Sequence, residues 1–266
     1  GLPELGVVGA AVATVISRYV QAGVVIIWTH THAERMPFIV GAYREWKIPE
    51  QLAKNIAIKG TPLMINEILW AAGMAILNQC YSMRGLDAVA AVNICGTISN
   101  LFNVVFMAMG SAISIIVGQL LGAGKMEEAQ DTDTKMIAFA VFSCLVMGGL
   151  LFLCSPLFPM IYNTTDTVRT LARNLLRTAA CCMPICAFMH ATYFTLRTGG
   201  KTIITFLFDS VFLWVVTTPV AYVLSRYTNM PIMYLYLCCQ LLDIIKCCIG
   251  FVLVKKGVWI ENIVVE

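Results

Sequence analysis

The chain has 266 residues, of which 59% are hydrophobic and 12% are charged, with a formal net charge of +3 and a mean hydropathy of +0.80. Soluble domains carry about 25% charged residues, so the composition excludes an ordinary soluble protein. It predicts a protein that crosses a lipid bilayer several times and has no nucleic-acid partner.

Seven apolar runs are each long enough for a helix to span about 30 Å of hydrocarbon, which takes roughly 20 residues. The runs are residues 5–29, 56–79, 92–121, 136–155, 174–196, 203–224 and 231–254. A membrane barrel would show short alternating strands instead. The predicted fold class is therefore all-α, a polytopic membrane helical bundle of about seven transmembrane helices.

Residues 30–55 form the one long polar interval, and Pro37 and Pro49 interrupt it. We interpret this interval as a cytosolic linker between a single helix in residues 1–29 and a six-helix lobe in residues 56–266. The eleven cysteines lie nearly all within the apolar runs, where we expect small packing residues. No metal and no cofactor is expected.

Lys and Arg residues in the short connections set the expected orientation, because cytosolic loops are enriched in them. The side that holds the linker also holds the turns with Lys125 and Arg197 and the C-terminal Lys255. It carries more positive charge than the opposite side. We therefore expect a multi-pass protein of the plasma (inner) membrane with a cytosolic C-terminus.

Glu67 interrupts the second apolar run, beside Asn66. At 1.5 Å per residue it lies roughly 16 Å from the cytosolic start of its helix, near the membrane midplane. Ionisable groups at that depth are costly and usually face a partner or a pathway. The same helix face carries the candidate lining residues Met64, Trp70, Met74 and Asn78, and the adjacent Asn66 is a further candidate. A carboxylate with an indole and thioethers suits a lipophilic organic cation, although ordinary helix packing also explains the methionines.

The third run carries polar side chains along one narrow arc of its helix. They are Asn93, Thr97, Asn100, Asn103, Ser111 and Ser114. Such a stripe is not expected to face lipid. It indicates either hydrogen bonds between helices or the wall of a water-filled cavity.

The last two runs form an antiparallel hairpin in which Asp209 and Lys246 lie at similar depths from the cytosolic side. Asp243, three residues before Lys246, shares its helix face. We expect an ion pair that joins the two helices, with a role in ion coupling as the alternative. In the fifth run, His190 and Tyr193 are further candidate lining residues. Alternatively, His190 is expected to pack or to hydrogen-bond with Tyr193.

Four segments taken in order resemble the multidrug and toxic compound extrusion (MATE) family of secondary transporters. They are GVVGAAVATVISR, IKGTPLMINEILW, VGQLLGAGKMEEAQ and LRTGGKT. The likeness covers essentially the whole chain, and the two glycine-containing turns are its most specific parts. We expect these glycines to make tight turns, with Gly122 and Gly124 placed where a Cβ would clash.

The resemblance implies one six-helix lobe of a two-lobe transporter plus one extra helix, with the rest of an N-terminal lobe as its missing partner. It implies efflux of lipophilic or cationic drugs in exchange for Na⁺ or H⁺, by alternating access. Glu67 matches an acidic residue proposed to bind the coupling cation in Na⁺-linked members. Those members pair it with an aspartate on the fifth span, where this sequence offers Cys186 and His190 but no Asp. The resemblance therefore leaves both Na⁺ and H⁺ open as the coupling ion.

Three other classes of protein compete with this interpretation. A lipid-linked saccharide flippase would share the architecture. A seven-helix retinal protein would suit Lys246, but the third run has no Asp or Glu to serve as counter-ion. A membrane enzyme would need a nucleophile with a matched base, and none is recognisable in the sequence.

Overall fold

The computed structural model of the chain describes residues 6–36, 39 and 50–260. Seven helical segments in them are long and apolar enough to cross a membrane, judged by length and composition. The helices are α1 (Gly6–Thr31), α2 (Glu50–Ser82), α3 (Leu86–Gly122), α4 (Met126–Cys154), η2 (Phe158–Ile161), α5 (Asp166–Thr198), α6 (Thr202–Phe206), η3 (Leu207–Val211), η4 (Leu213–Thr217), α7 (Thr218–Tyr227), α8 (Ile232–Leu241) and α9 (Asp243–Lys255). The all-α fold with seven candidate spans is confirmed.

The chain divides into two compact units, residues 1–56 and 57–266. The first unit contains α1, whose side chains are exposed along nearly its whole length. The second unit contains the helical bundle. The expected linker of residues 30–55 differs at both ends: residues 30–31 are the end of α1, and residues 50–55 are the first turns of α2. Pro37 and Pro49 lie outside the described residues.

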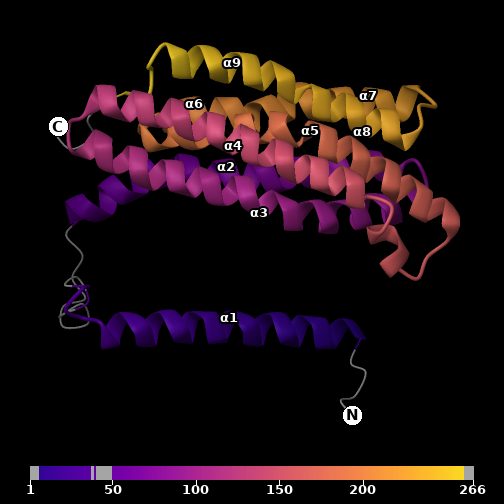
Figure 1. Ribbon diagram of the computed structural model, residues 1–266, viewed down its shortest axis with the longest axis horizontal. Coiled ribbons are helices and arrows are strands. Elements are labelled where there is room, and N and C mark those ends of the chain that lie inside the picture. The colour runs from indigo at the N-terminus through magenta and orange to yellow at the C-terminus, as the bar shows by residue number, and fades with distance from the viewer. Residues whose placement is uncertain (1–5, 37–38, 40–49, 261–266) are drawn as a thin grey trace. The chain divides into compact units, whose positions relative to one another are not determined.

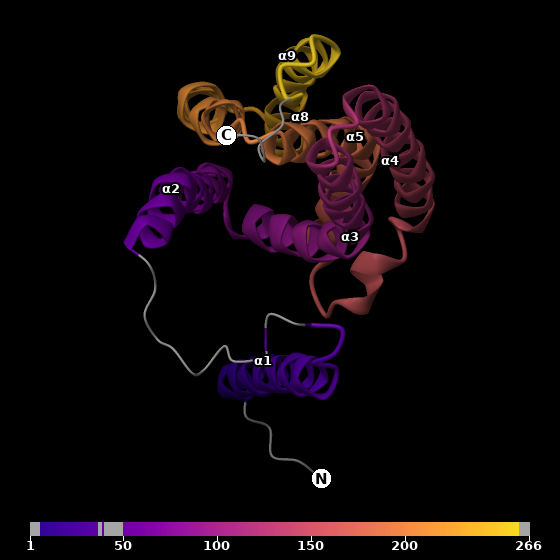
Figure 2. The same ribbon diagram turned by 90° about the vertical axis from the view of Figure 1, so that its left-hand side faces the viewer.

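Helix α5 lies at the centre of the second unit. It packs against α3 and α4 on one side and against α8 and α9 on another (Figures 1 and 2). The hydroxyl of Thr165 accepts a hydrogen bond from the Val168 amide at 3.4 Å and so caps the start of α5. Because α3, α4, α8 and α9 all contact α5, its polar side chains are placed where several spans can reach them.

The sixth span, Thr202–Tyr227, is not a continuous α-helix. It begins as α6, widens into the two π-helical turns η3 and η4, and continues as α7. Turns of this kind are rare and occur frequently at functional sites. The wide turns carry Asp209 and Trp214, both of which contact other helices through polar groups.

Glycines shape the turns in VGQLLGAGKMEEAQ and LRTGGKT, in part as expected. Gly124 and Gly200 both have φ of +74°, in the left-handed region that side chains with a Cβ disfavour. Gly122 does not have positive φ, and a Cβ there would meet nothing within 4 Å. The expectation that Gly122 relieves a clash was therefore wrong, because its surroundings are open.

Candidate functional site

Glu67 lies on the face of α2 that the described residues leave uncovered. Its side chain is 63% exposed, and its Oε1 lies 4.0 Å from Nη1 of Arg197 on α5. This distance is longer than a hydrogen bond between charged groups, so the pair holds its partners weakly. The Glu67 carboxylate is therefore available to exchange Arg197 for another cation.

The other side chains expected beside Glu67 largely share its exposed face. Met64 is 59% exposed and Trp70 is 44% exposed. Asn78 is also exposed, whereas Met74 is half-buried. The face thus combines one carboxylate with apolar and aromatic surface, which is a chemistry suited to organic cations.

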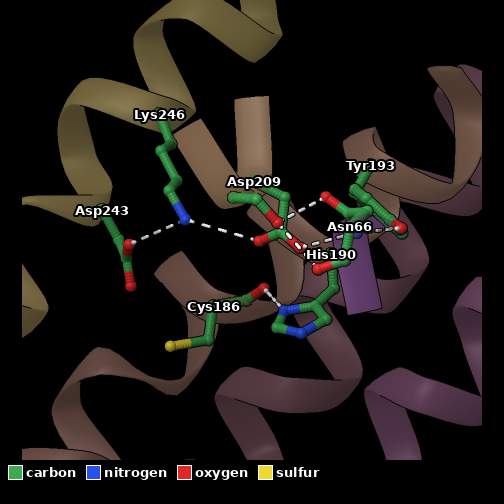
Figure 3. A network of polar contacts seen from close by, with 8 residues as sticks. Asn66, Cys186, His190, Tyr193, Asp209, Asp243 and Lys246 are labelled. Atoms are coloured by element: carbon green, nitrogen blue, oxygen red, sulfur yellow. Dashed lines mark hydrogen bonds and ion pairs between the residues drawn. The ribbon is translucent and has the colours of Figure 1, made fainter. Parts of the chain in front are cut away.

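Asn66, although adjacent to Glu67, points into the bundle and is only 2% exposed. Its Nδ2 lies 3.4 Å from Oδ2 of Asp209 and 3.5 Å from the Tyr193 hydroxyl (Figure 3). The Ser210 hydroxyl lies 2.6 Å from Asn66 Oδ1 and 2.9 Å from its backbone oxygen. Asn66 therefore joins α2 to the π-helical turns and to α5, and does not line the exposed face.

Two further contacts bring α2 close to these wide turns. Trp214 Nε1 donates to the Leu69 backbone oxygen at 2.9 Å. A Cβ on Gly73 would lie 2.5 Å from Cδ2 of Leu213. The position of Glu67 therefore depends on how α2 and the sixth span fit together.

Lys246 on α9 lies between two carboxylates in the bundle interior (Figure 3). Its Nζ is 3.7 Å from Oδ1 of Asp209 and 3.7 Å from Oδ1 of Asp243. The Lys246 side chain is 7% exposed, and its Nζ also lies 5.2 Å from the centre of the Phe212 ring. The structure thus brings together the three residues that hairpin geometry predicted to meet.

His190 is placed near this network without joining its charged groups. Its Nδ1 lies 2.9 Å from the Cys186 backbone oxygen, as Figure 3 shows. Its ring centre is 4.5 Å from that of Phe106. Of the two expectations for His190, packing is therefore observed, and its hydrogen-bond partner is Cys186 where Tyr193 was expected.

The polar stripe of α3 is mostly exposed. Asn93 and Asn100 are exposed and Asn103 is half-buried, and their side chains make no hydrogen bond to the described residues. In contrast, Ser114 accepts a bond of 3.1 Å from Thr198 on α5. Most of the stripe is therefore free to line a space beside α3.

A hollow of about 500 Å³ lies between α3 and α5 at the end of this stripe. Its lining residues are Ser111, Ser114, Ile115, Phe194, Arg197 and Thr198. Arg197 thus both lines the hollow and contacts Glu67. From the sequence, Arg197 is expected only in the cytosolic turn, since nothing local indicates that its side chain reaches towards α2.

Comparisons with known proteins agree with this architecture. A family model described as MatE matches residues 62–223. The chain is 24% identical over 237 residues to "Probable multidrug resistance protein YoeA" of Bacillus subtilis (strain 168), covering 88% of this chain and 50% of that protein. It is 28% identical over 230 residues to "Multidrug resistance protein MdtK" of Photorhabdus laumondii, covering 85% of this chain and 49% of that protein.

Solved structures share the fold. A structure described as "Crystal structure of MATE in the straight conformation" superimposes with a TM-score of 0.79 at 20% identity, covering 94% of this chain and 56% of that chain. The chain spans about half the length of the curated relatives it matches.

Proposed function

Because this chain belongs to the MatE family, whose model matches residues 62–223, we propose that it forms the C-terminal portion of a drug:cation antiporter. The transporter expels lipophilic or cationic organic compounds in exchange for Na⁺ or H⁺. Several of its relatives are described as multidrug resistance proteins. The proposal places it in the plasma membrane with its C-terminus in the cytosol.

The observation that carries the proposal is the exposed carboxylate of Glu67 within a candidate span. An organic cation or a coupling ion competes with Arg197 for this carboxylate. When the coupling ion binds to Glu67, the drug is released, and this alternation exchanges drug for ion. Met64 and Trp70, exposed on the same face, supply apolar and cation–π contacts for the drug.

Alternating access requires a second lobe. The exposed carboxylate of Glu67 and the unpaired asparagines of α3 are polar groups that lipid would not solvate. In the proposal an N-terminal lobe covers them, and rocking of the two lobes exposes Glu67 to each side of the membrane in turn.

The test is dye efflux from vesicles under separately imposed Na⁺ and H⁺ gradients. The chain is joined to a preceding lobe, and Glu67→Gln is compared with its parent at equal protein. Glu67→Gln keeps the shape and removes the charge, so efflux should lose its dependence on the coupling gradient. Glu50→Gln, at the exposed start of the same helix, is the matched control and should transport normally.

Two outcomes would overturn parts of the proposal. Gradient-driven efflux that is unchanged in Glu67→Gln would remove the coupling role from this residue. Robust ion-dependent efflux by the 266-residue chain alone would show that a second lobe is not needed.

A further inference from the structure

A group of arginines lies at the opposite end of α5 from the turn that holds Arg197. At 1.5 Å per residue, the 33 residues of α5 extend about 50 Å, which exceeds the roughly 30 Å of hydrocarbon in a bilayer. The first turns of α5 and the connection in residues 155–165 therefore lie at the level of the lipid headgroups.

Three arginines, each four residues apart, share one face of this part of α5. Arg169 pairs with Asp166 at 3.0 Å and donates to the backbone oxygen of Tyr162 at 3.2 Å. Arg177 donates from Nε to the Ser155 hydroxyl at 3.2 Å. Both side chains are thus held in place by the protein.

Arg173, between them, is different. Its side chain has no hydrogen bond or ion pair with any residue that the structure describes. Its Nε is nevertheless buried, as is Nε of Arg169, and neither atom has an acceptor. Buried donors normally have partners, and a guanidinium at a water-excluding surface binds oxyanions strongly. The arrangement leaves one positive charge without an acceptor.

Arg169 and Arg173 line a hollow of about 420 Å³. Its polar lining comes from Asp166, Arg169, Thr170 and Arg173. The lining holds two guanidiniums, of Arg169 and Arg173, and one carboxylate, of Asp166, so it carries one net positive charge. The site therefore favours an anion with a single negative charge.

The rest of the lining is apolar and continues onto an exposed ledge. Pro156, Pro159 and Met160 line the hollow. Next to it, Leu157 is 62% exposed and Ile161 is 79% exposed. Exposed aliphatic side chains at the headgroup boundary give the glycerol and the first methylenes of the acyl chains a contact surface, which a free inorganic anion would not use.

We propose that this hollow binds the phosphodiester headgroup of an anionic glycerophospholipid. The Arg173 guanidinium donates to the phosphate oxygens, Thr170 borders the headgroup, and Leu157 and Ile161 contact the glycerol and the first methylenes of the acyl chains. A zwitterionic lipid binds less well because its ammonium group is repelled by the arginines. The site is separate from the Glu67 face, so lipid binding here does not depend on the proposed transport function.

Native mass spectrometry of the full chain in detergent tests the site, with phosphatidylglycerol, phosphatidylcholine and inorganic phosphate as probes. Phosphatidylglycerol should bind in preference to phosphatidylcholine. Arg173→Gln should weaken its binding about tenfold, which corresponds to about 1.4 kcal/mol, and Arg173→Lys should retain part of it. Arg226→Gln, an exposed arginine at the same end of the bundle, should leave binding unchanged.

A second variant guards against loss of folding in Arg173→Gln. Asp166 has a 96% exposed side chain, and Asp166→Asn removes the one carboxylate from the hollow. It should tighten phosphatidylglycerol binding severalfold. Equal binding by the parent and Arg173→Gln would overturn the proposal. So would equal binding of phosphatidylcholine, or displacement of the lipid by inorganic phosphate at the same concentration.

Discussion

The Lys246 ammonium lies 3.7 Å from Oδ1 of Asp209, although the two residues belong to different candidate spans. Because the Lys246 side chain is 7% exposed, solvent does little to screen this pair or the second one, with Asp243. Breaking a buried ion pair on one side leaves an uncompensated charge. The pair is therefore expected to hold the last two spans together.

Lys246→Met should destabilise the protein, since Asp209 and Asp243 would both lose their counter-ion. The expected loss is about 3–5 kcal/mol in the free energy of unfolding, measured by denaturant unfolding in detergent. Adding Asp209→Asn to the same chain should recover part of the loss. Purely additive effects would show that Asp209 is not the partner. Lys256→Met, at an exposed position, serves as the control.

Ser210→Ala should weaken the junction between α2 and the sixth span. It removes the donor that reaches Asn66 Oδ1 at 2.6 Å, and a buried acceptor without a donor costs about 1–3 kcal/mol. A double-mutant cycle with Asn66→Leu, read out by thermal unfolding, measures the coupling energy. A coupling energy near zero would mean that the Ser210–Asn66 hydrogen bond does not contribute to stability. Ser111→Ala, on the exposed part of α3, is the control for removal of a serine hydroxyl.

Gly124→Ala and Gly122→Ala should have different effects, although both change the same turn. Gly124 has φ of +74°, so a Cβ there should cost about 1 kcal/mol in stability. Gly122 ends α3 with open space around it, and alanine should be neutral or slightly stabilising. The measurement is the unfolding midpoint of each variant. Equal losses of stability would show that the two glycines do not differ in their conformational role.

Gly199→Ala should disturb the C-terminal segment. A Cβ on Gly199 would lie 2.1 Å from the backbone oxygen of Trp259, whose side chain is completely buried. Because the obstacle is backbone, Trp259 must move and its indole should become accessible to water. A red shift of tryptophan emission, with faster proteolysis near the C-terminus, is the expected result. An unchanged spectrum would show that the segment accommodates the methyl group.

The candidate site was only partly predictable from sequence. Glu67 and Asn66 stood out together because both are polar in an apolar run. They are adjacent, however, and helix periodicity alone does not say which one faces the bundle interior. Packing against Ser210 and Asp209 decides this, and it leaves Glu67 exposed. The proximity of Arg197 to Glu67 depends equally on how α5 meets α2.

The amino-acid sequence by itself determined the all-α membrane fold, its candidate spans and its membership of the MatE family. Hydropathy is a property of each run of about 20 residues, so it needs no knowledge of neighbouring helices. Even the meeting of Lys246 and Asp209 followed from chain length, because two antiparallel helices place residues at equal depth side by side. Only the tertiary structure decided the rotation of each helix, the approach of Trp259 to Gly199, and the absence of a partner for Arg173 among the described residues. These features arise from contacts between segments far apart in the chain, where no local pattern specifies the partner.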